Sequence, residues 1–210
     1  TLGRSIDNGF REETPRIEKD QLLPYGVYPI EVAHNQQTAI RVGVEMFNKS
    51  HPDYVGLFVL TTVLGGYFGS RLMGNLREEQ GLTYNAYAHL ETFRYGGYFG
   101  IGTEVSKGKE ELAIQSINHE VKQLKEKLIP NEELKMVKNY LLGSYLNLID
   151  GPFNLASAWR ELLIERLPPD YFERENNAIK ALTSKDLREL ANKYLNLDKM
   201  YWAIVGNTNI

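Results

Sequence analysis

Residues 64–84 of the chain read LGGYFGSRLMGNLREEQGLTY. Within this stretch, residues 69–80 mix Arg, Leu, Met, Asn and Glu and predict a short helix. Gly81 stands where a helix C-terminal glycine is expected. Residues 82–88 then alternate in polarity and predict a strand. The segment therefore predicts a helix and a strand that meet at one tight, glycine-broken corner.

Arg77 and Tyr84 lie seven residues apart on either side of this corner, and both side chains end in hydrogen-bond donors. An arginine presents a rigid fork of N–H groups and a tyrosine one hydroxyl, which together suit a peptide carbonyl or a developing oxyanion. Such a pair can assist peptide-bond chemistry but does not perform it alone. A structural interpretation is also open. In it, Arg77 pairs with Glu78, Glu79 or another surface carboxylate, and Tyr84 packs in the core.

The segment resembles the signature of the non-catalytic half of the pitrilysin/insulinase family of zinc metallopeptidases, which includes mitochondrial processing peptidase. A glycine-rich approach of the form LGGxFxSRL is matched by Leu64, Gly65, Gly66, Phe68, Ser70, Arg71 and Leu72. An RExxGxxY element is matched by Arg77, Glu78, Gly81 and Tyr84. The likeness is looser elsewhere but extends to strands around residues 36–47 and 97–104 and to the long helices beyond.

The resemblance implies a role for these residues. It assigns binding of the substrate carbonyl to Arg77 and Tyr84, which would project into the zinc site of the opposite half. The supporting loop would comprise Gly65, Gly66, Phe68, Ser70 and Arg71. The partner would be a zinc-bearing half, in the same precursor chain or in a separate subunit as a homo- or heterodimer. The peptide substrate would lie as an extended strand added to a sheet edge.

The histidines of this chain do not form the zinc-binding motif of the family. Catalytic members carry H-x-x-E-H, in which the two histidines ligate zinc and the glutamate activates water. The chain has four histidines and no such motif. His89 and Glu91 form an i, i+2 pair on an apparent strand, which could make half a metal site or a surface salt contact. We therefore expect zinc in the partner half, and an isolated chain without activity of its own.

Composition limits the other function classes. A chain of 210 residues can bury a conventional core, and its formal net charge of −3 gives no reason to expect nucleic acid or anionic membrane as a partner. The absence of cysteine excludes disulfides and thiol chemistry and leaves the compartment open. The most apolar run, residues 54–64, is too short to span a bilayer. The start at Thr1 suggests a fragment or a processed product.

The rest of the chain predicts an α+β fold. Residues 1–30, with scattered Gly and Pro, suggest a linker or extended arm, and residues 31–210 the pitrilysin-type domain. Strands are expected at 38–47, 84–90, 98–105 and 200–205, and helices at 53–66, 114–128, 131–150, 153–166 and 183–194. Because strands are followed by a helical run and a final strand, we expect an antiparallel sheet covered on one face by helices.

Two glycine clusters, residues 65–69 and 97–102, invite a nucleotide-binding interpretation. Neither fits G-x-G-x-x-G in a strand–turn–helix setting, and neither is followed by Lys-Ser or Lys-Thr. The first cluster instead predicts close approach of one backbone to another, and the second a strand whose small residues let a neighbour come near.

Two functions remain open. In the first, the chain is the catalysis-assisting half of a zinc metalloendopeptidase. In the second, it is a non-catalytic scaffold or binding subunit, as the resemblance to core subunits of the cytochrome bc1 complex allows, and Arg77 and Tyr84 are structural remnants. An H-x-x-E-H segment in the same polypeptide or an adjacent gene would favour the first.

Overall fold

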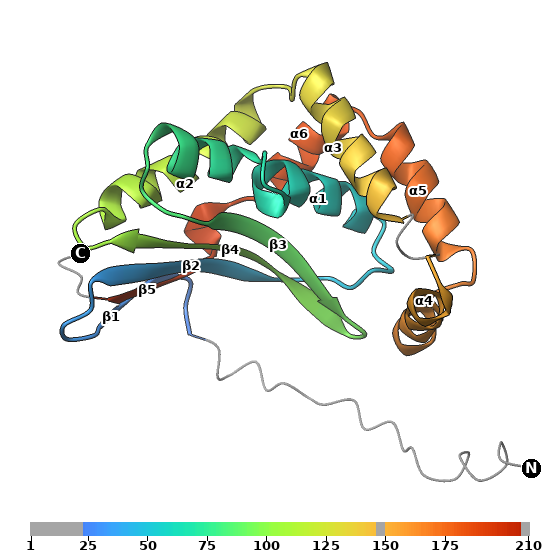
Figure 1. Ribbon diagram of the computed structural model, residues 1–210, viewed down its shortest axis with the longest axis horizontal. Helices are drawn as coiled ribbons and strands as arrows, with labels where there is room; N and C mark the ends of the chain where they lie inside the picture. The colour runs from blue at the N-terminus through green and yellow to red at the C-terminus, as the bar shows by residue number, and fades with distance from the viewer. Residues whose placement is uncertain (1–22, 146–149, 207–210) are drawn as a thin grey trace, which may run out of the picture.

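The computed structural model describes residues 23–145 and 150–206, which form one sheet with helices stacked on one of its faces (Figure 1). The sheet has five strands in the order β1-β5-β2-β4-β3. Their bounds are β1 Gly26–Glu31, β2 Gln37–Met46, β3 Ala86–Phe93, β4 Gly96–Ser106 and β5 Tyr201–Gly206. The predicted α+β class, with helices on one side of the sheet, is confirmed.

Strand pairing departs from the prediction at one edge. The pairs β2–β4, β3–β4 and β2–β5 are antiparallel as expected, whereas β1 runs parallel to β5. Within residues 1–30, predicted as a linker or extended arm, residues 26–30 belong to the edge strand β1, and residues 1–22 lie outside the described part. Pro29 lacks a backbone N–H, so the strand that carries it is tolerated at a sheet edge, where one side needs no partner.

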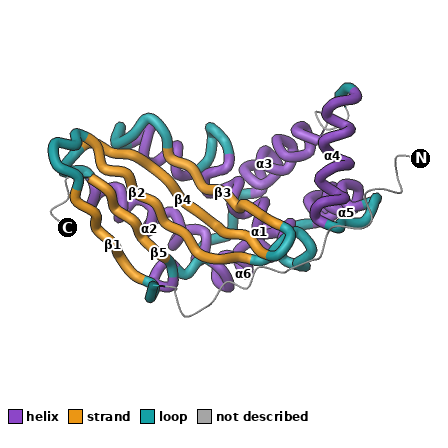
Figure 2. Tube along the Cα trace, turned by 90° about the horizontal axis from the view of Figure 1, so that it is seen from below, coloured by secondary structure: helices purple, strands orange, loops and turns teal. Residues whose placement is uncertain are grey.

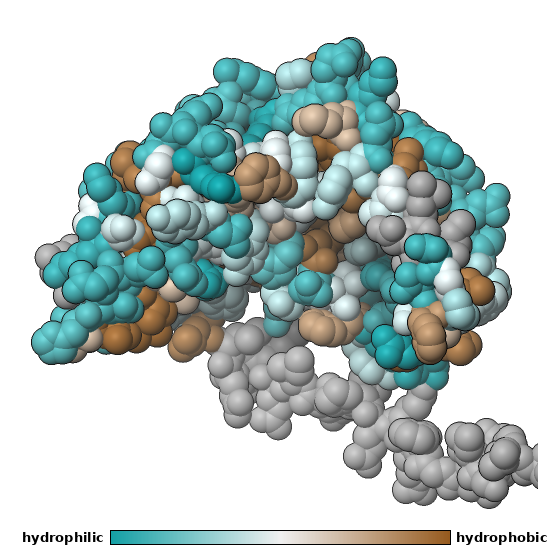
Figure 3. All heavy atoms as spheres, in the orientation of Figure 1, coloured by the Kyte–Doolittle hydropathy of each residue, from teal (hydrophilic) through white to brown (hydrophobic). Residues whose placement is uncertain are grey.

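The helices form the second layer. Their bounds are α1 Tyr54–Thr61, α2 Glu110–Glu126, α3 Asn131–Ser144, α4 Pro152–Glu165, α5 Tyr171–Ala181 and α6 Ser184–Tyr194. Two wider π-helical segments, Thr62–Gly66 and Met73–Glu79, follow α1. Figure 2 shows the opposite face of the sheet with the strands in front and the helices behind. In Figure 3, hydrophilic side chains gather over the helical layer.

The core lies between the sheet and the helices. The inward residues of β2 and β4 include Ile40, Phe99 and Ile101, which are almost completely buried. They pack in one cluster with Leu57 and Leu60 of α1. As its nearly uniform apolar character predicts, α1 is the central buried helix.

Several predicted boundaries shift in the structure. The helix expected over 69–80 is π-helical from Met73 to Glu79, so its turns close through longer i→i+5 bonds. The strand expected from Leu82 begins at Ala86. The helix expected over 131–150 ends at Ser144, and residues 146–149 lie outside the described part. Helix α5 was not predicted. The capping box of Thr183 and Asp186 at the start of α6 is confirmed.

Candidate functional site

Tyr84 lies in the loop between the π-helical segment Met73–Glu79 and β3. The chain reverses at Gly81, whose φ of 60° is the left-handed conformation that glycine adopts without strain. Across this reversal the Leu82 N–H donates to the Leu76 carbonyl at 2.8 Å. The predicted glycine C-terminus is therefore confirmed, and the loop starts from a fixed point.

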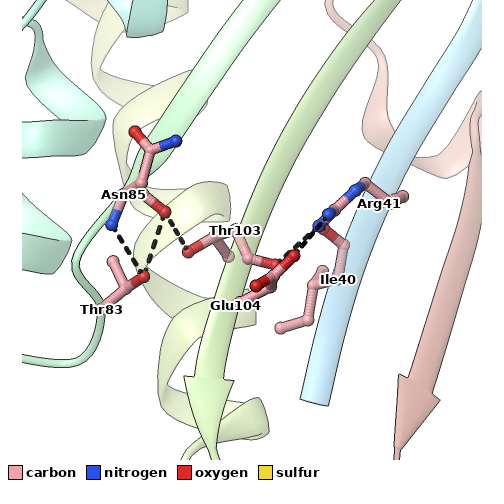
Figure 4. Close-up of polar contacts among 6 residues, drawn as sticks. All are labelled: Ile40, Arg41, Thr83, Asn85, Thr103 and Glu104. Carbon is pink, nitrogen blue, oxygen red and sulfur yellow. Dashed lines mark hydrogen bonds and ion pairs between the residues drawn. The ribbon is translucent and has the colours of Figure 1, made fainter. Parts of the chain in front are cut away.

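Hydrogen bonds hold the loop on both sides of Tyr84 (Figure 4). The Thr83 hydroxyl donates to the Asn85 carbonyl at 3.0 Å and accepts from the Asn85 N–H at 3.1 Å. The Thr103 hydroxyl of β4 donates to the same carbonyl at 3.0 Å. Because its neighbours are fixed to β4, Tyr84 is directed outward and is 90% exposed. The interpretation that places Tyr84 in the core is wrong.

Arg77 lies on the other side of the turn, in the last part of the π-helical segment. Its guanidinium carbon is 4.6 Å from the ring centroid of Phe68, and Nε is 3.5 Å from a Glu78 carboxylate oxygen. The Glu78 contact is the one that the structural interpretation expects. Stacking on Phe68 occupies the face of the guanidinium and leaves its in-plane N–H donors available.

The predicted supporting loop connects the end of α1 to this segment. A Cβ built on Gly65 would stand 2.2 Å from the Ala88 backbone nitrogen of β3. No side chain fits at this distance, so the predicted close approach of backbones is confirmed at Gly65. A Cβ built on Gly66 would stand 3.1 Å from Cβ of Thr62. Gly65 therefore sets the separation between α1 and the strand that follows Tyr84.

The rest of the supporting loop is fixed to α3. The Arg71 guanidinium donates to both carboxylate oxygens of Glu133 at 2.8 Å, a bidentate pair. Next to it, the rings of Tyr67 and Tyr140 lie 5.3 Å apart. Ser70 is buried, whereas Phe68 is 67% exposed and forms the platform under Arg77. Arg71 thus acts as an anchor of the loop.

A small groove of about 130 Å³ opens beside Tyr84. It is lined by Gln37, Arg41, Thr83, Tyr84, Asn85, Tyr87, Thr103 and Glu104, and Arg77 is not among these residues. The Arg41 guanidinium donates to the Thr103 carbonyl at 2.9 Å and to a Glu104 carboxylate oxygen at 2.8 Å (Figure 4). The sequence prediction missed Arg41 and Glu104. Their outward positions in the alternation of β2 and β4 are the signal that could have placed them here.

The described residues, 23–145 and 150–206, contain no group of three or more His, Asp or Glu side chains that could hold a metal ion. The His89 ring lies 5.6 Å from that of Tyr87 and 5.2 Å from that of Tyr98. Burial lowers the pKa of His89, which favours the neutral imidazole. The part of the chain that the structure describes also lacks any helix with the length and apolar character needed to cross a bilayer.

The chain matches known proteins in both sequence and fold. The model of a protein family described as "Peptidase M16 inactive domain" matches residues 7–141, more than half of the chain. The chain is 28% identical over 152 residues to the non-peptidase homolog YmxG of Helicobacter pylori, with 71% of this chain and 34% of that protein covered. It is 27% identical over 111 residues to the uncharacterized zinc protease YmxG of Bacillus subtilis, with 53% of this chain and 27% of the relative covered.

Solved structures show the same fold. A peptidase M16 inactive domain from Pseudomonas fluorescens matches with a TM-score of 0.81 and 25% identity, over 88% of this chain and 44% of that one. An inactive peptidase domain from Bordetella parapertussis matches with a TM-score of 0.69 and 17% identity, over 81% of this chain and 92% of that one. The chain thus spans about a third of the H. pylori relative and less than half of the P. fluorescens chain.

Proposed function

Since the chain belongs to the peptidase M16 family, as its inactive domain, we propose that it is the catalysis-assisting half of a zinc metalloendopeptidase. In this role Arg77 and Tyr84 hold the carbonyl of the scissile peptide bond while a zinc-bearing partner half hydrolyses the bond. The resemblance to the non-catalytic half of the pitrilysin/insulinase family is confirmed by the family match. The roles of the two residues are our proposal.

The observation that carries the proposal is the position of Tyr84. Hydrogen bonds to β4 hold the backbone of the loop, and the exposed Tyr84 side chain presents its hydroxyl to a ligand outside the domain. Such a donor can stabilise the charge that develops on a carbonyl oxygen once the closed partner half holds the two together. The alternative of a buried structural tyrosine would need core packing, which a side chain 90% exposed lacks.

Arg77 suits the same task. Its stacking on Phe68 supports the guanidinium plane, and its ion pair with Glu78 is weak because the Glu78 side chain is 60% exposed. A carbonyl oxygen that gains negative charge can therefore compete for its N–H donors. The two donors would approach one oxygen when the partner half closes over the turn at Gly81.

The zinc belongs to the partner in this proposal. No His-x-x-Glu-His occurs in the sequence, and the described residues offer no three-ligand cluster. The P. fluorescens chain is more than twice as long as the part that this chain matches, which leaves room for a second half in such relatives. Here the partner half would be covalently attached or a separate subunit. Zinc there would supply the bound water that attacks the carbonyl.

A non-catalytic scaffold is the second candidate, and one observation favours it. The H. pylori relative is named a non-peptidase homolog. Under this alternative, Tyr84 and Arg77 bind no substrate carbonyl, and the domain acts only by binding other proteins through its surface.

Reconstitution distinguishes the two candidates. The chain is mixed with the zinc-bearing half encoded in the same polypeptide or in a neighbouring gene, and hydrolysis of a quenched fluorescent peptide library is followed. We expect hydrolysis only in the mixture, with complete loss on addition of a chelator. A tight complex that hydrolyses no peptide with any metal would support the scaffold and overturn the proposal.

A further inference from the structure

The face of the sheet opposite the helices, seen in Figure 2, carries three glycines on the neighbouring strands β2 and β4. The outward residues of β4 include Gly100 and Gly102, and Gly43 of β2 pairs directly with Gly100. Arg41 pairs with Gly102 in the next row. These three outward positions contribute no side chain of their own to the middle of this face.

Two of these glycines are explained by rings of the chain itself. A Cβ built on Gly102 would stand 2.4 Å from Cζ of Tyr87, and one built on Gly100 would stand 2.5 Å from Cε1 of His89. The rings of these two β3 residues therefore lie against the backbone of β4. Glycine is needed at both positions to admit them.

Gly43 faces no such ring. Among the described residues, a Cβ built there meets one atom within 4 Å, the Phe99 carbonyl oxygen at 3.3 Å, a tight contact on the backbone side. Glycine inside a strand weakens it, because its backbone loses more freedom on folding and contributes no packing side chain. No side chain of the described residues therefore fills the space above Gly43.

This space is a trough of about 410 Å³, whose walls are Arg41, Tyr87, His89, Tyr98 and Tyr201 and whose floor includes Gly43. The rings of His89 and Tyr98 meet edge to face at an interplanar angle of 85°. We call it the glycine trough. Its size accommodates any amino-acid side chain, and its walls are mainly aromatic.

The glycine trough adjoins the groove beside Tyr84, since Arg41 and Tyr87 line both. Tyr84 and Tyr87 are three residues apart along the chain, which is roughly 10 Å when extended. A peptide held by its carbonyl at Tyr84 would therefore reach the trough with a side chain about three to five residues away.

We propose that the glycine trough binds an aromatic side chain of the peptide whose scissile carbonyl is held at Tyr84. The inference rests on the proposed function and names a substrate class for it. Ring-lined walls favour an aromatic guest because offset and edge-to-face contacts add stability beyond buried area. A cationic side chain is disfavoured, since the Arg41 guanidinium already lies 5.9 Å from the centroid of the Tyr87 ring.

Peptide binding to the ¹⁵N-labelled full chain tests the inference. The probes are three acetylated and amidated alanine peptides that carry one central phenylalanine, leucine or lysine. We expect the phenylalanine peptide to shift the amide resonances of Gly43, Gly100 and Gly102. The leucine peptide should bind about three- to tenfold more weakly, the size of an aromatic pair contribution, and the lysine peptide more weakly still.

Variants locate the binding. Gly43→Val fills the trough from its floor and should abolish the shifts at Gly100 and Gly102. Tyr201→Ala removes a wall without filling the trough. It should weaken binding of the peptides and keep their order of affinity. Ala39→Val, on the same face of β2 but outside the trough lining, is the matched control and should bind as the unmodified chain does.

Three results would overturn the inference. The first is equal binding of the phenylalanine and leucine peptides, or no shift with either. The second is unchanged binding by both trough variants. The third is a shift at Gly43 that depends on protein concentration without peptide, which would assign the trough to a second copy of the chain. Loss of the trough shifts while the reconstituted pair still hydrolyses peptide would overturn the trough alone, whereas trough shifts without any hydrolysis would overturn the carbonyl-holding role alone.

Discussion

The exposure of Tyr84 follows from its neighbours and not from its own chemistry. A tyrosine packs equally well in a core or at a surface, so its type alone says little about its position. Thr83 and Asn85 form a hydrogen-bonded loop, and Thr103 fixes that loop to β4. Because the Thr103 contact joins residues 18 positions apart, local sequence does not reveal it. The sequence therefore predicts the corner at Gly81 but not the direction of Tyr84.

The buried carboxyl of Glu175 predicts that the free energy of unfolding depends on pH. This carboxyl of α5 is almost completely buried and accepts a long contact of 3.4 Å from the Tyr171 hydroxyl. Burial raises the pKa of Glu175, and this effect outweighs the lowering of the pKa by the Tyr145 hydroxyl and the Lys49 ammonium. The folded protein then holds the proton more tightly than the unfolded chain, so its free energy of unfolding falls as pH rises through the folded pKa.

Glu175→Gln removes this dependence. Glutamine keeps an acceptor for Tyr171 and never ionises, so the variant should exceed the unmodified chain in urea midpoint at about pH 8 and lose that advantage near pH 4–5. Urea denaturation followed by circular dichroism at both pH values measures the effect. A constant difference at all pH values would show that the buried carboxyl does not titrate between the two states.

Elements whose stabilisation is local were predicted well. The Thr183 capping box, the glycine end at Gly81 and the apolar α1 all follow from spacing within a few residues. Helix α5 was missed because its buried stripe includes Tyr171 and Glu175, which weaken the apolar signal. Strand β1 was missed because the strand that it pairs with, β5, lies about 175 positions later in the chain.

Gly65 tests how α1 is joined to the sheet. Gly65→Ala should lower the free energy of unfolding by about 1–3 kcal/mol, because the added Cβ would overlap the backbone of β3 near Ala88. Urea denaturation measures the loss.

Gly143→Ala, in the last turn of α3, is the matched control for this substitution. No atom of the described residues that it could newly meet lies within 4 Å of its Cβ position, so the substitution should be neutral or should stabilise by up to about 1 kcal/mol. Equal effects of the two substitutions would contradict the close approach at Gly65.

At the scale of the whole molecule, the described residues form an α+β domain with helices on one face of the sheet, and the groove beside Tyr84 and the glycine trough share Arg41 and Tyr87 in their lining. The sequence predicts the layer arrangement, since strands precede a helical run and a strand ends the chain. It does not predict the aligned glycines 43, 100 and 102 as one surface, because strand register brings them together.

The isolated chain and the assembled pair should differ in how they respond to metal. Chelator and added zinc should both leave the thermal midpoint of the isolated chain unchanged, because its described residues form no three-ligand site. Differential scanning fluorimetry detects any change. A zinc-dependent rise of several degrees would reveal a metal site in this chain, since a ligand that binds only the folded state raises its stability.

The central claim is that Tyr84 holds the substrate carbonyl in the transition state, and the kinetics of Tyr84→Phe in the reconstituted pair test it most directly. The side chain is 90% exposed, so removal of its hydroxyl leaves the fold unchanged, and Tyr95→Phe on the β3–β4 turn is the matched control. We predict that kcat falls about 100- to 1,000-fold while KM changes less than about threefold, as expected for a lost oxyanion donor. Equal kcat in Tyr84→Phe and the unmodified pair would contradict the account.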